Sequence, residues 1–265
     1  MISYGAYMAN PRIIAIVNQK GGVGKTTTTI NLAAGLTLRG KKVLLIDLDP
    51  QGNAATGLGI PRTQRDITVY DVLVEGTPIA QATMDTVVPG LKLVPSHIDL
   101  AGAELEIGDR AGRTTILRDA LEGVDVDYVL IDCPPSLNLL TVNALSAARS
   151  VLVPLQCEFF ALEGLSQLLQ TVEMAKANIN PKLVIDGVML TMYDGRNRLS
   201  AQVAADVRKH LGRAVFKTVI PRNVRIAEAP SFGKPVTMYD PDCAGSVAYI
   251  ALADEILSRH AKTRH

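Results

Sequence analysis

The chain has 265 residues, 48% of them hydrophobic, and its 27 lysines and arginines nearly balance 26 aspartates and glutamates. This length can bury a full core, and α/β folds of this size commonly form one domain. No apolar run approaches the ~18 residues of a membrane span, and residues 1–12 lack the layout of a signal peptide, so we expect a cytoplasmic protein without a membrane segment.

Short apolar runs alternate with helical patterns along the chain. The predicted strands are residues 13–18, 42–47, 91–95, 127–132, 150–155, 183–192 and 214–220, and the predicted helices are residues 25–39, 114–121, 139–148, 162–177, 201–211 and 245–260. This alternation predicts an α/β fold, a mostly parallel twisted sheet with helices on both faces. We expect one domain over residues 11–265 after a short flexible lead at 1–10, in which Met8 is a second candidate start.

A glycine-rich loop, residues 19–27, joins the first predicted strand to the first predicted helix. Its sequence is Q-K-G-G-V-G-K-T-T. Glycines allow a turn whose N–H groups point inward, a helix begins there, Lys25 supplies a positive charge, and Thr26 supplies a hydroxyl for Mg²⁺. A turn that binds nothing is the alternative. The context favours a nucleotide-phosphate site made of Lys20, Gly21, Gly22, Val23, Gly24, Lys25, Thr26 and Thr27.

The loop departs from the usual phosphate-loop pattern in two places. Gln19 replaces its first glycine, and Lys20 precedes the glycine pair. The segment resembles the deviant Walker A ATPases, with the pattern K-G-G-x-G-K-[ST]. This resemblance implies that Lys20 reaches across a dimer to the partner's nucleotide, whereas an isolated lysine beside a loop is usually only solvated.

Two carboxylates, Asp47 and Asp49, follow the second predicted strand in the turn D-L-D-P-Q-G-N. An ordinary Asp-Pro turn is one interpretation. Beside a phosphate loop, a carboxylate here can orient the attacking water, since phosphoryl transfer needs positioning more than covalent help. We therefore assign hydrolysis to Asp49, with Lys20 and Lys25 as the other catalytic residues. The turn resembles the family's switch I motif, which implies that Asp47 lies nearer the metal.

Asp132 ends the apolar strand Y-V-L-I-D and precedes Cys133, Pro134 and Pro135. A lone aspartate there often caps a helix or forms a turn. Mg²⁺ typically takes only one or two protein carboxylates, so beside the phosphate loop Asp132 is the predicted metal ligand, with Thr26 completing the site. The D-x-P-P-S sequence again resembles the family's pattern.

The three cysteines, Cys133, Cys157 and Cys243, are far apart and form no C-x-x-C pair. We expect buried small side chains there, and neither a disulfide framework, a zinc site nor an iron–sulfur cluster.

The charge is unevenly distributed along the chain. Residues 1–195 hold 15 lysines and arginines against 20 acids, whereas residues 196–265 hold 12 against 6. A basic C-terminal quarter indicates contact with nucleic acid or an anionic membrane, although scattered solvated charges would give the same count.

Two further loops, residues 191–196 and 219–230, follow the last two predicted strands. Turn chemistry alone accounts for their glycine and prolines. The sequences of these two loops, together with L-Q-C-E-F-F-A-L-E-G at residues 155–164, resemble the ParA/Soj chromosome-partitioning ATPases, and the resemblance extends over nearly the whole chain. The resemblance implies that Pro221 and Asn223 lie near the adenine, and that Arg196, Arg222 and Arg225 bind double-stranded DNA without sequence preference.

The resemblance also implies how the protein works: an ATP-dependent homodimer binds DNA on the nucleoid, and a ParB-type partner stimulates slow hydrolysis of ATP to ADP and phosphate. Two alternatives share the motifs. One is a MinD-like membrane regulator, but residues 260–265 offer no apolar helix face. The other is positioning of a protein cargo such as a chemoreceptor cluster. A metabolic ATPase is an enzyme-class rival.

Overall fold

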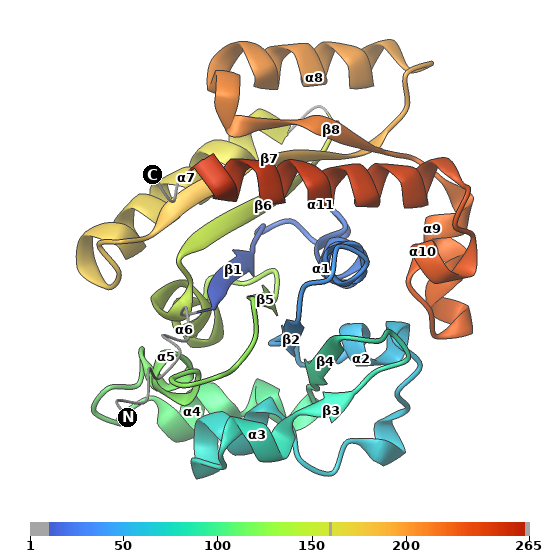
Figure 1. The fold of residues 1–265 in the computed structure, drawn as a ribbon. Coiled ribbons are helices and arrows are strands. Elements are labelled where there is room, and N and C mark those ends of the chain that lie inside the picture. Colours follow the sequence, from blue (N-terminus) through green and yellow to red (C-terminus); the bar gives the residue numbers. More distant parts are fainter. Residues whose placement is uncertain (1–10, 159–160, 263–265) are drawn as a thin grey trace, which may run out of the picture.

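One eight-stranded sheet organises the protein (Figure 1). The structure is a computed structural model that describes residues 11–158 and 161–262, so the lead predicted at 1–10 lies outside the described residues. All neighbouring strands are parallel except β3 and β4, which confirms the predicted fold class. In sheet order the strands are β3 (Met84–Asp85), β4 (Leu91–Val94), β2 (Val43–Asp47), β5 (Tyr128–Asp132), β1 (Arg12–Ile16), β6 (Ser150–Gln156), β7 (Val184–Tyr193) and β8 (Val215–Pro221).

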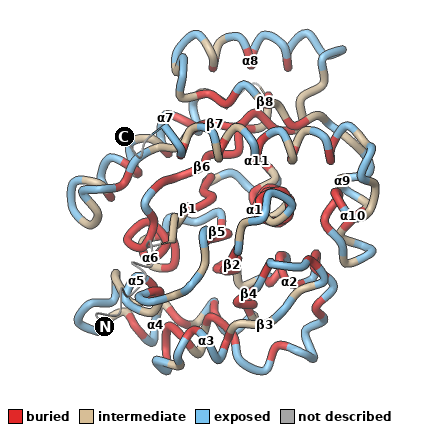
Figure 2. Tube along the Cα trace, viewed as in Figure 1, coloured by how far each residue is buried: buried red, intermediate tan, exposed pale blue. Residues whose placement is uncertain are grey.

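Side chains of the central strands alternate between two separate apolar cores. In β1, Ile14 and Ile16 belong to one core and Ala15 to the other, and all three are completely buried. Successive strand residues point to opposite faces, so a strand covered on both sides must be apolar throughout. The buried central strands in Figure 2 follow this rule.

Helices cover both faces of the sheet. The face with α1 carries α1 (Lys25–Thr37), α2 (Asn53–Gly57), α9 (Val224–Glu228), α10 (Val236–Tyr239) and α11 (Ala244–Lys262). The other face carries α3 (Ile79–Ala82), α4 (Ala103–Ile107), α5 (Ile116–Ala120), α6 (Leu139–Ala147), α7 (Ala161–Asn178) and α8 (Arg198–Leu211). Short 3₁₀ or π turns lie at Arg62–Gln64, Asp71–Glu75, Ile98–Ala101, Gly212–Ala214 and Ala229–Phe232.

The structure extends and corrects several predicted elements. The helix predicted at 201–211 begins at Arg198, because the Asn197 side chain accepts a hydrogen bond from the Leu199 N–H and caps it. The helix predicted at 114–121 is shorter, Ile116–Ala120. Strand β3 and helices α2, α3, α4, α9 and α10 were not predicted, because elements of two to five residues carry too few positions to show a period.

The β7–β8 contact depends on the missing side chain of Gly187. A Cβ added there would lie 2.6 Å from Cε2 of Phe216, a fully buried ring on β8. The Arg259 guanidinium of α11 covers that ring at 3.8 Å from its centroid. The main-chain oxygen of Ala214 lies 2.7 Å from the same added Cβ, so a methyl group must displace a neighbour.

We predict that Gly187→Ala lowers the free energy of unfolding by about 1–3 kcal/mol, the usual cost of overpacking a core. Gly164→Ala, in α7 with no atom within 4 Å of an added Cβ, should instead stabilise by about 0.5–1 kcal/mol through helix propensity. Urea denaturation of both variants measures the difference. Equal effects would contradict the packing account.

Candidate functional site

The glycine-rich loop lies between the carboxyl end of β1 and the start of α1. Gly22 and Gly24 have φ angles of 74° and 89°, in the left-handed region that favours glycine. Nothing lies within 4 Å of a Cβ added at Gly21 or Gly22, so the space beside the loop is open. Because α1 begins at Lys25, its unpaired N–H groups and positive dipole end face the loop.

Lys25 is the buried cation of the site. Its side chain folds back over the loop, and Nζ donates a hydrogen bond to the main-chain oxygen of Lys20 at 3.1 Å. The residue is only 8% exposed. Burial lowers the pKa of Lys25, and the nearby charges of Asp132 and Asp49 oppose that shift. A cation buried in this way requires anionic partners.

Asp132 ends β5 beside the loop and is completely buried. Its Oδ1 accepts a hydrogen bond from the Thr29 hydroxyl at 3.1 Å, whereas Oδ2 is buried without a partner among the described residues. Burial raises the pKa of Asp132 to about 7, although the nearby hydroxyls of Thr26 and Thr29 oppose the shift. An unpaired buried carboxylate oxygen near a threonine hydroxyl fits a Mg²⁺ ion, which prefers oxygen ligands.

Asp47 lies next to Asp132 in the sheet register and is also completely buried. Its Oδ1 accepts from the Asp49 N–H at 3.1 Å and its Oδ2 from the Ala54 N–H at 3.0 Å. Burial, and then the charge of Asp132, raise the pKa of Asp47 well above its ordinary value. Both oxygens therefore hold the turn that follows β2.

Asp49 stands in that turn and is only partly buried. Its Oδ1 accepts a hydrogen bond from the Gln51 N–H at 3.0 Å. The charge of Asp49 contributes to the pKa of both Lys25 and Asp132, so it lies within electrostatic reach of both groups. The three predicted motifs thus meet at the carboxyl edge of β1, β2 and β5.

Lys20 has a different environment from Lys25. Its side chain is 51% exposed, and Nζ forms an ion pair with Oε2 of Glu158 at 2.5 Å. Glu158 follows β6, the strand beside β1. Among the described residues, the structure thus places the two lysines of the loop in separate sites, one buried and one at the rim.

Four supporting residues were not predicted from the sequence. Thr29 lies one helical turn after Lys25, a spacing that could have signalled its role. The Thr191 hydroxyl donates to the Val23 oxygen at 2.9 Å and ties β7 to the loop. Buried Arg65 donates to the Gly52 and Ile60 oxygens and holds the turn after Asp49. Glu158 lies in the segment 155–164 that resembles the family, but its pairing with Lys20 was not predicted because the two residues are distant in sequence.

The predicted adenine and DNA residues lie together after β7 and β8. The Arg222 N–H donates to the Tyr193 oxygen at 2.9 Å, which joins the two loops. Hydrogen bonds from Arg196, and the charge of Arg222, lower the pKa of Asp194 between them. Asn223, beside Pro221, caps α9 by accepting from the Arg225 N–H.

Arg196 and Arg225 differ in how strongly they are paired. The Arg196 side chain is 92% exposed, and within the described residues its one ion pair is with Asp194. Arg225 pairs with Glu228 at 3.0 Å and with Asp240 at 3.1 Å. Arg196 is therefore the more available cation of the two.

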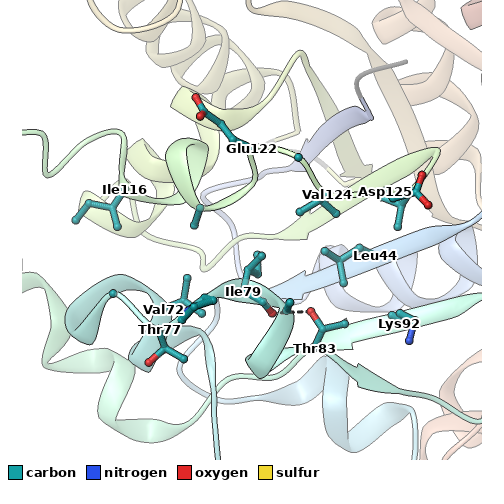
Figure 3. Close-up of a pocket in the computed structure, with 16 residues that line it drawn as sticks. Leu44, Val72, Thr77, Ile79, Thr83, Lys92, Ile116, Glu122, Val124 and Asp125 are labelled. Atoms are coloured by element: carbon teal, nitrogen blue, oxygen red, sulfur yellow. Dashed lines mark hydrogen bonds between the residues drawn. The ribbon is translucent and has the colours of Figure 1, made fainter. Parts of the chain in front are cut away.

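A large, mostly apolar cavity lies away from this site. It has a volume of about 710 Å³ and lies at the amino ends of the strands, beside Leu44, Lys92 and Val126 (Figure 3). Because the loop follows the carboxyl end of β1, this cavity is at the opposite edge of the sheet.

In the part of the chain that the structure describes, no group of three or more His, Cys, Asp and Glu side chains is arranged to hold a metal ion. None of the helices described between residues 11 and 262 is long and apolar enough to cross a membrane.

Residues 11–185 match the family model described as an AAA domain. The chain is 61% identical over 256 residues to the chromosome partitioning protein ParA of Caulobacter vibrioides, and the match covers 95% of this chain and 96% of that protein. It is 53% identical over 247 residues to the sporulation initiation inhibitor protein Soj of Bacillus subtilis, with 92% and 98% covered.

Two solved structures with bound nucleotide resemble the fold. Cobyrinic acid a,c-diamide synthase from Mycobacterium smegmatis, with ADP and magnesium, gives a TM-score of 0.83 at 40% identity, covering 96% of this chain and 97% of that one. The septum site-determining protein MinD from Pyrococcus horikoshii, with Mg-ADP, gives 0.78 at 29% identity, covering 93% and 96%. These matches and the geometry of the loop show that the chain belongs to the ParA/Soj family of chromosome-partitioning ATPases.

Proposed function

We propose that this ATPase is a nucleotide-dependent dimer switch that partitions DNA, with residues 11–265 acting as one nucleotide-binding domain. The observation that carries the proposal is the meeting of Lys25, Asp49 and Asp132 at the edge of the sheet beside an open glycine loop. Its ParA and Soj relatives supply the biological context.

ATP would bind with its phosphates against the loop. The N–H groups of residues 21–27 and the Lys25 ammonium are the donors, and Thr26 and Asp132 would hold Mg²⁺, with Pro221 and Asn223 near the adenine. Bound Mg²⁺ would neutralise charge on the β and γ phosphates. Asp47 already accepts two main-chain hydrogen bonds, so we assign it to shaping the turn.

Hydrolysis would use Asp49 to orient a water molecule toward the γ-phosphate. The water oxygen forms a bond to phosphorus, the bond to the ADP oxygen breaks, and the proton of the water passes to the phosphate products. This chemistry needs alignment and charge stabilisation, which the buried Lys25 supplies without reorganising.

In the dimer, Lys20 would contact the phosphates of the partner subunit, as the deviant loop pattern implies. Closure of two subunits doubles the exposed basic groups, which include Arg196 and Arg222. Nonspecific DNA binding comes from neutralising phosphates and releasing counterions, so a doubled basic face binds DNA more tightly. A ParB-type partner would then stimulate hydrolysis, and the dimer would separate and leave the DNA. The protein would thus alternate between the nucleoid and the surrounding cytoplasm.

Three other functions are compatible with the same fold. A metabolic synthetase is favoured by the 40% identical Mycobacterium smegmatis structure, yet identity to ParA reaches 61%. A MinD-like membrane role is favoured by the 29% identical Pyrococcus horikoshii structure, but the identity to ParA is again higher. Positioning of a protein cargo shares every feature proposed here.

Asp49→Ala should reduce ATP turnover by about 100-fold or more, the usual effect of losing a group that positions or activates the attacking water. Binding of ATP should remain near that of the parent, because Asp49 does not bind the phosphates. A phosphate-release assay and a fluorescent-nucleotide titration measure the two effects. Retained turnover would move the hydrolytic role to another residue.

Lys20→Ala should remain monomeric with a non-hydrolysable ATP analogue and Mg²⁺, whereas the parent protein forms a dimer. Lys182→Ala, which removes an exposed lysine between α7 and β7, is the matched control and should dimerise normally. Sedimentation velocity measures whether each variant is a monomer or a dimer. Dimers of the Lys20 variant at parental affinity would refute its action across the interface.

Arg196→Ala should weaken DNA binding and reduce the slope of log affinity against log salt by about 2, since each dimer loses two phosphate contacts. Arg225→Ala should change that slope less, because two carboxylates already pair with Arg225. Arg118→Ala is the control and should leave the slope unchanged, because Arg118 lies in α5 and not in the loops that follow β7 and β8. Fluorescence anisotropy with duplex DNA at several salt concentrations tests this, and a slope unaffected by Arg196→Ala would count against the DNA-binding face.

A further inference from the structure

The ion pair between Lys20 and Glu158 joins the phosphate loop to the turn before α7. Oε2 of Glu158 lies 2.5 Å from Nζ of Lys20, although the two residues are far apart in sequence. Their side chains are 51% and 45% exposed, so the pair sits at the rim of the site rather than inside it. The lysine that distinguishes this loop is therefore held by a carboxylate of its own subunit.

The main chain on the lysine side of the pair is fixed. The Lys20 N–H donates to Oδ1 of Asn18 at 3.0 Å, and the Asn18 amide donates to the Pro154 oxygen of β6 at 2.7 Å. The Lys20 oxygen accepts from the buried Lys25 ammonium. Only the Lys20 side chain can change partner without disturbing these contacts.

The glutamate side is fixed as well. The Glu158 N–H donates to the Gln156 oxygen at 2.9 Å, and the Glu158 oxygen accepts from the N–H of Ala161, the first residue of α7. The Gln156 side-chain amide donates to Oε1 of the same carboxylate. Glu158 is thus held with one oxygen toward Gln156 and the other toward Lys20.

We propose that Glu158 is a positioning residue that keeps Lys20 within its own subunit until the phosphates of a partner-bound ATP displace it. This inference rests on the dimer switch proposed above. A half-exposed ion pair stabilises weakly, whereas a triphosphate carries several negative charges. The pair is therefore weak enough to yield to ATP and strong enough to oppose closure without it.

The first test measures dimer affinity with a non-hydrolysable ATP analogue and Mg²⁺. Glu158→Gln keeps the shape of the side chain and removes its charge, so closure no longer breaks an ion pair in each subunit. The dimer should form about three- to tenfold more tightly than in the parent protein. Glu163→Gln removes an equal charge from an exposed position in α7 and should leave dimer affinity unchanged.

The second test needs no nucleotide and no dimer. Reductive methylation followed by mass spectrometry measures how readily the Lys20 amine reacts in the nucleotide-free protein. Labelling of Lys20 should rise about threefold in Glu158→Gln relative to both the parent and Glu163→Gln, because a weak exposed pair shields the amine by roughly this factor. Labelling of Lys182 serves as an internal reference.

The two tests separate the possible failures. Unchanged Lys20 labelling, or dimer affinity that is unchanged or weaker in Glu158→Gln, overturns the positioning role. If the parent protein never dimerises with the analogue, the proposed switch itself fails, and the gating role fails with it even where the labelling difference persists. Increased labelling together with a tighter dimer supports the proposal.

Discussion

The buried charges at the carboxyl edge of the sheet are the constraint on which the site depends. Asp132 and Asp47 lie side by side in fully buried strands, and Lys25 is nearly as buried beside them. Charges removed from water cost free energy unless they find partners. Main-chain N–H groups satisfy Asp47, whereas Asp132 keeps one oxygen that has no partner among the described residues. The site is therefore organised to receive a cation together with an anion, as magnesium with a nucleotide phosphate would provide.

The two lysines of the loop divide its work by burial. Lys25 is buried and folds over its own loop, so it suits a ligand of the same subunit. Lys20 is half-exposed at the rim, where a partner molecule can reach it. In the proposed switch, one lysine of the loop binds the nucleotide of its own subunit and the other contacts the nucleotide of the partner. Dimer closure, and the DNA affinity proposed to follow from it, would depend on that difference in burial.

Fold and motifs were predictable from the sequence for a physical reason. Strands buried on both faces must be apolar throughout, as β2 and β5 are, and ligand groups then follow directly at their ends. The prediction failed where a contact joins distant residues, as between Lys20 and Glu158, or where an element is as short as β3. From the sequence, Asp49 was assigned to hydrolysis and Asp47 to the metal side of the site, whereas in the structure both oxygens of Asp47 accept main-chain hydrogen bonds of the turn that follows β2.

The most direct measurement is a crystal structure of the protein with a non-hydrolysable ATP analogue and magnesium. The account predicts two copies face to face, with magnesium beside Asp132 and the Lys20 ammonium of each copy on the phosphates of the other. A single protomer whose Lys20 remains paired with Glu158 while the nucleotide is bound would contradict it.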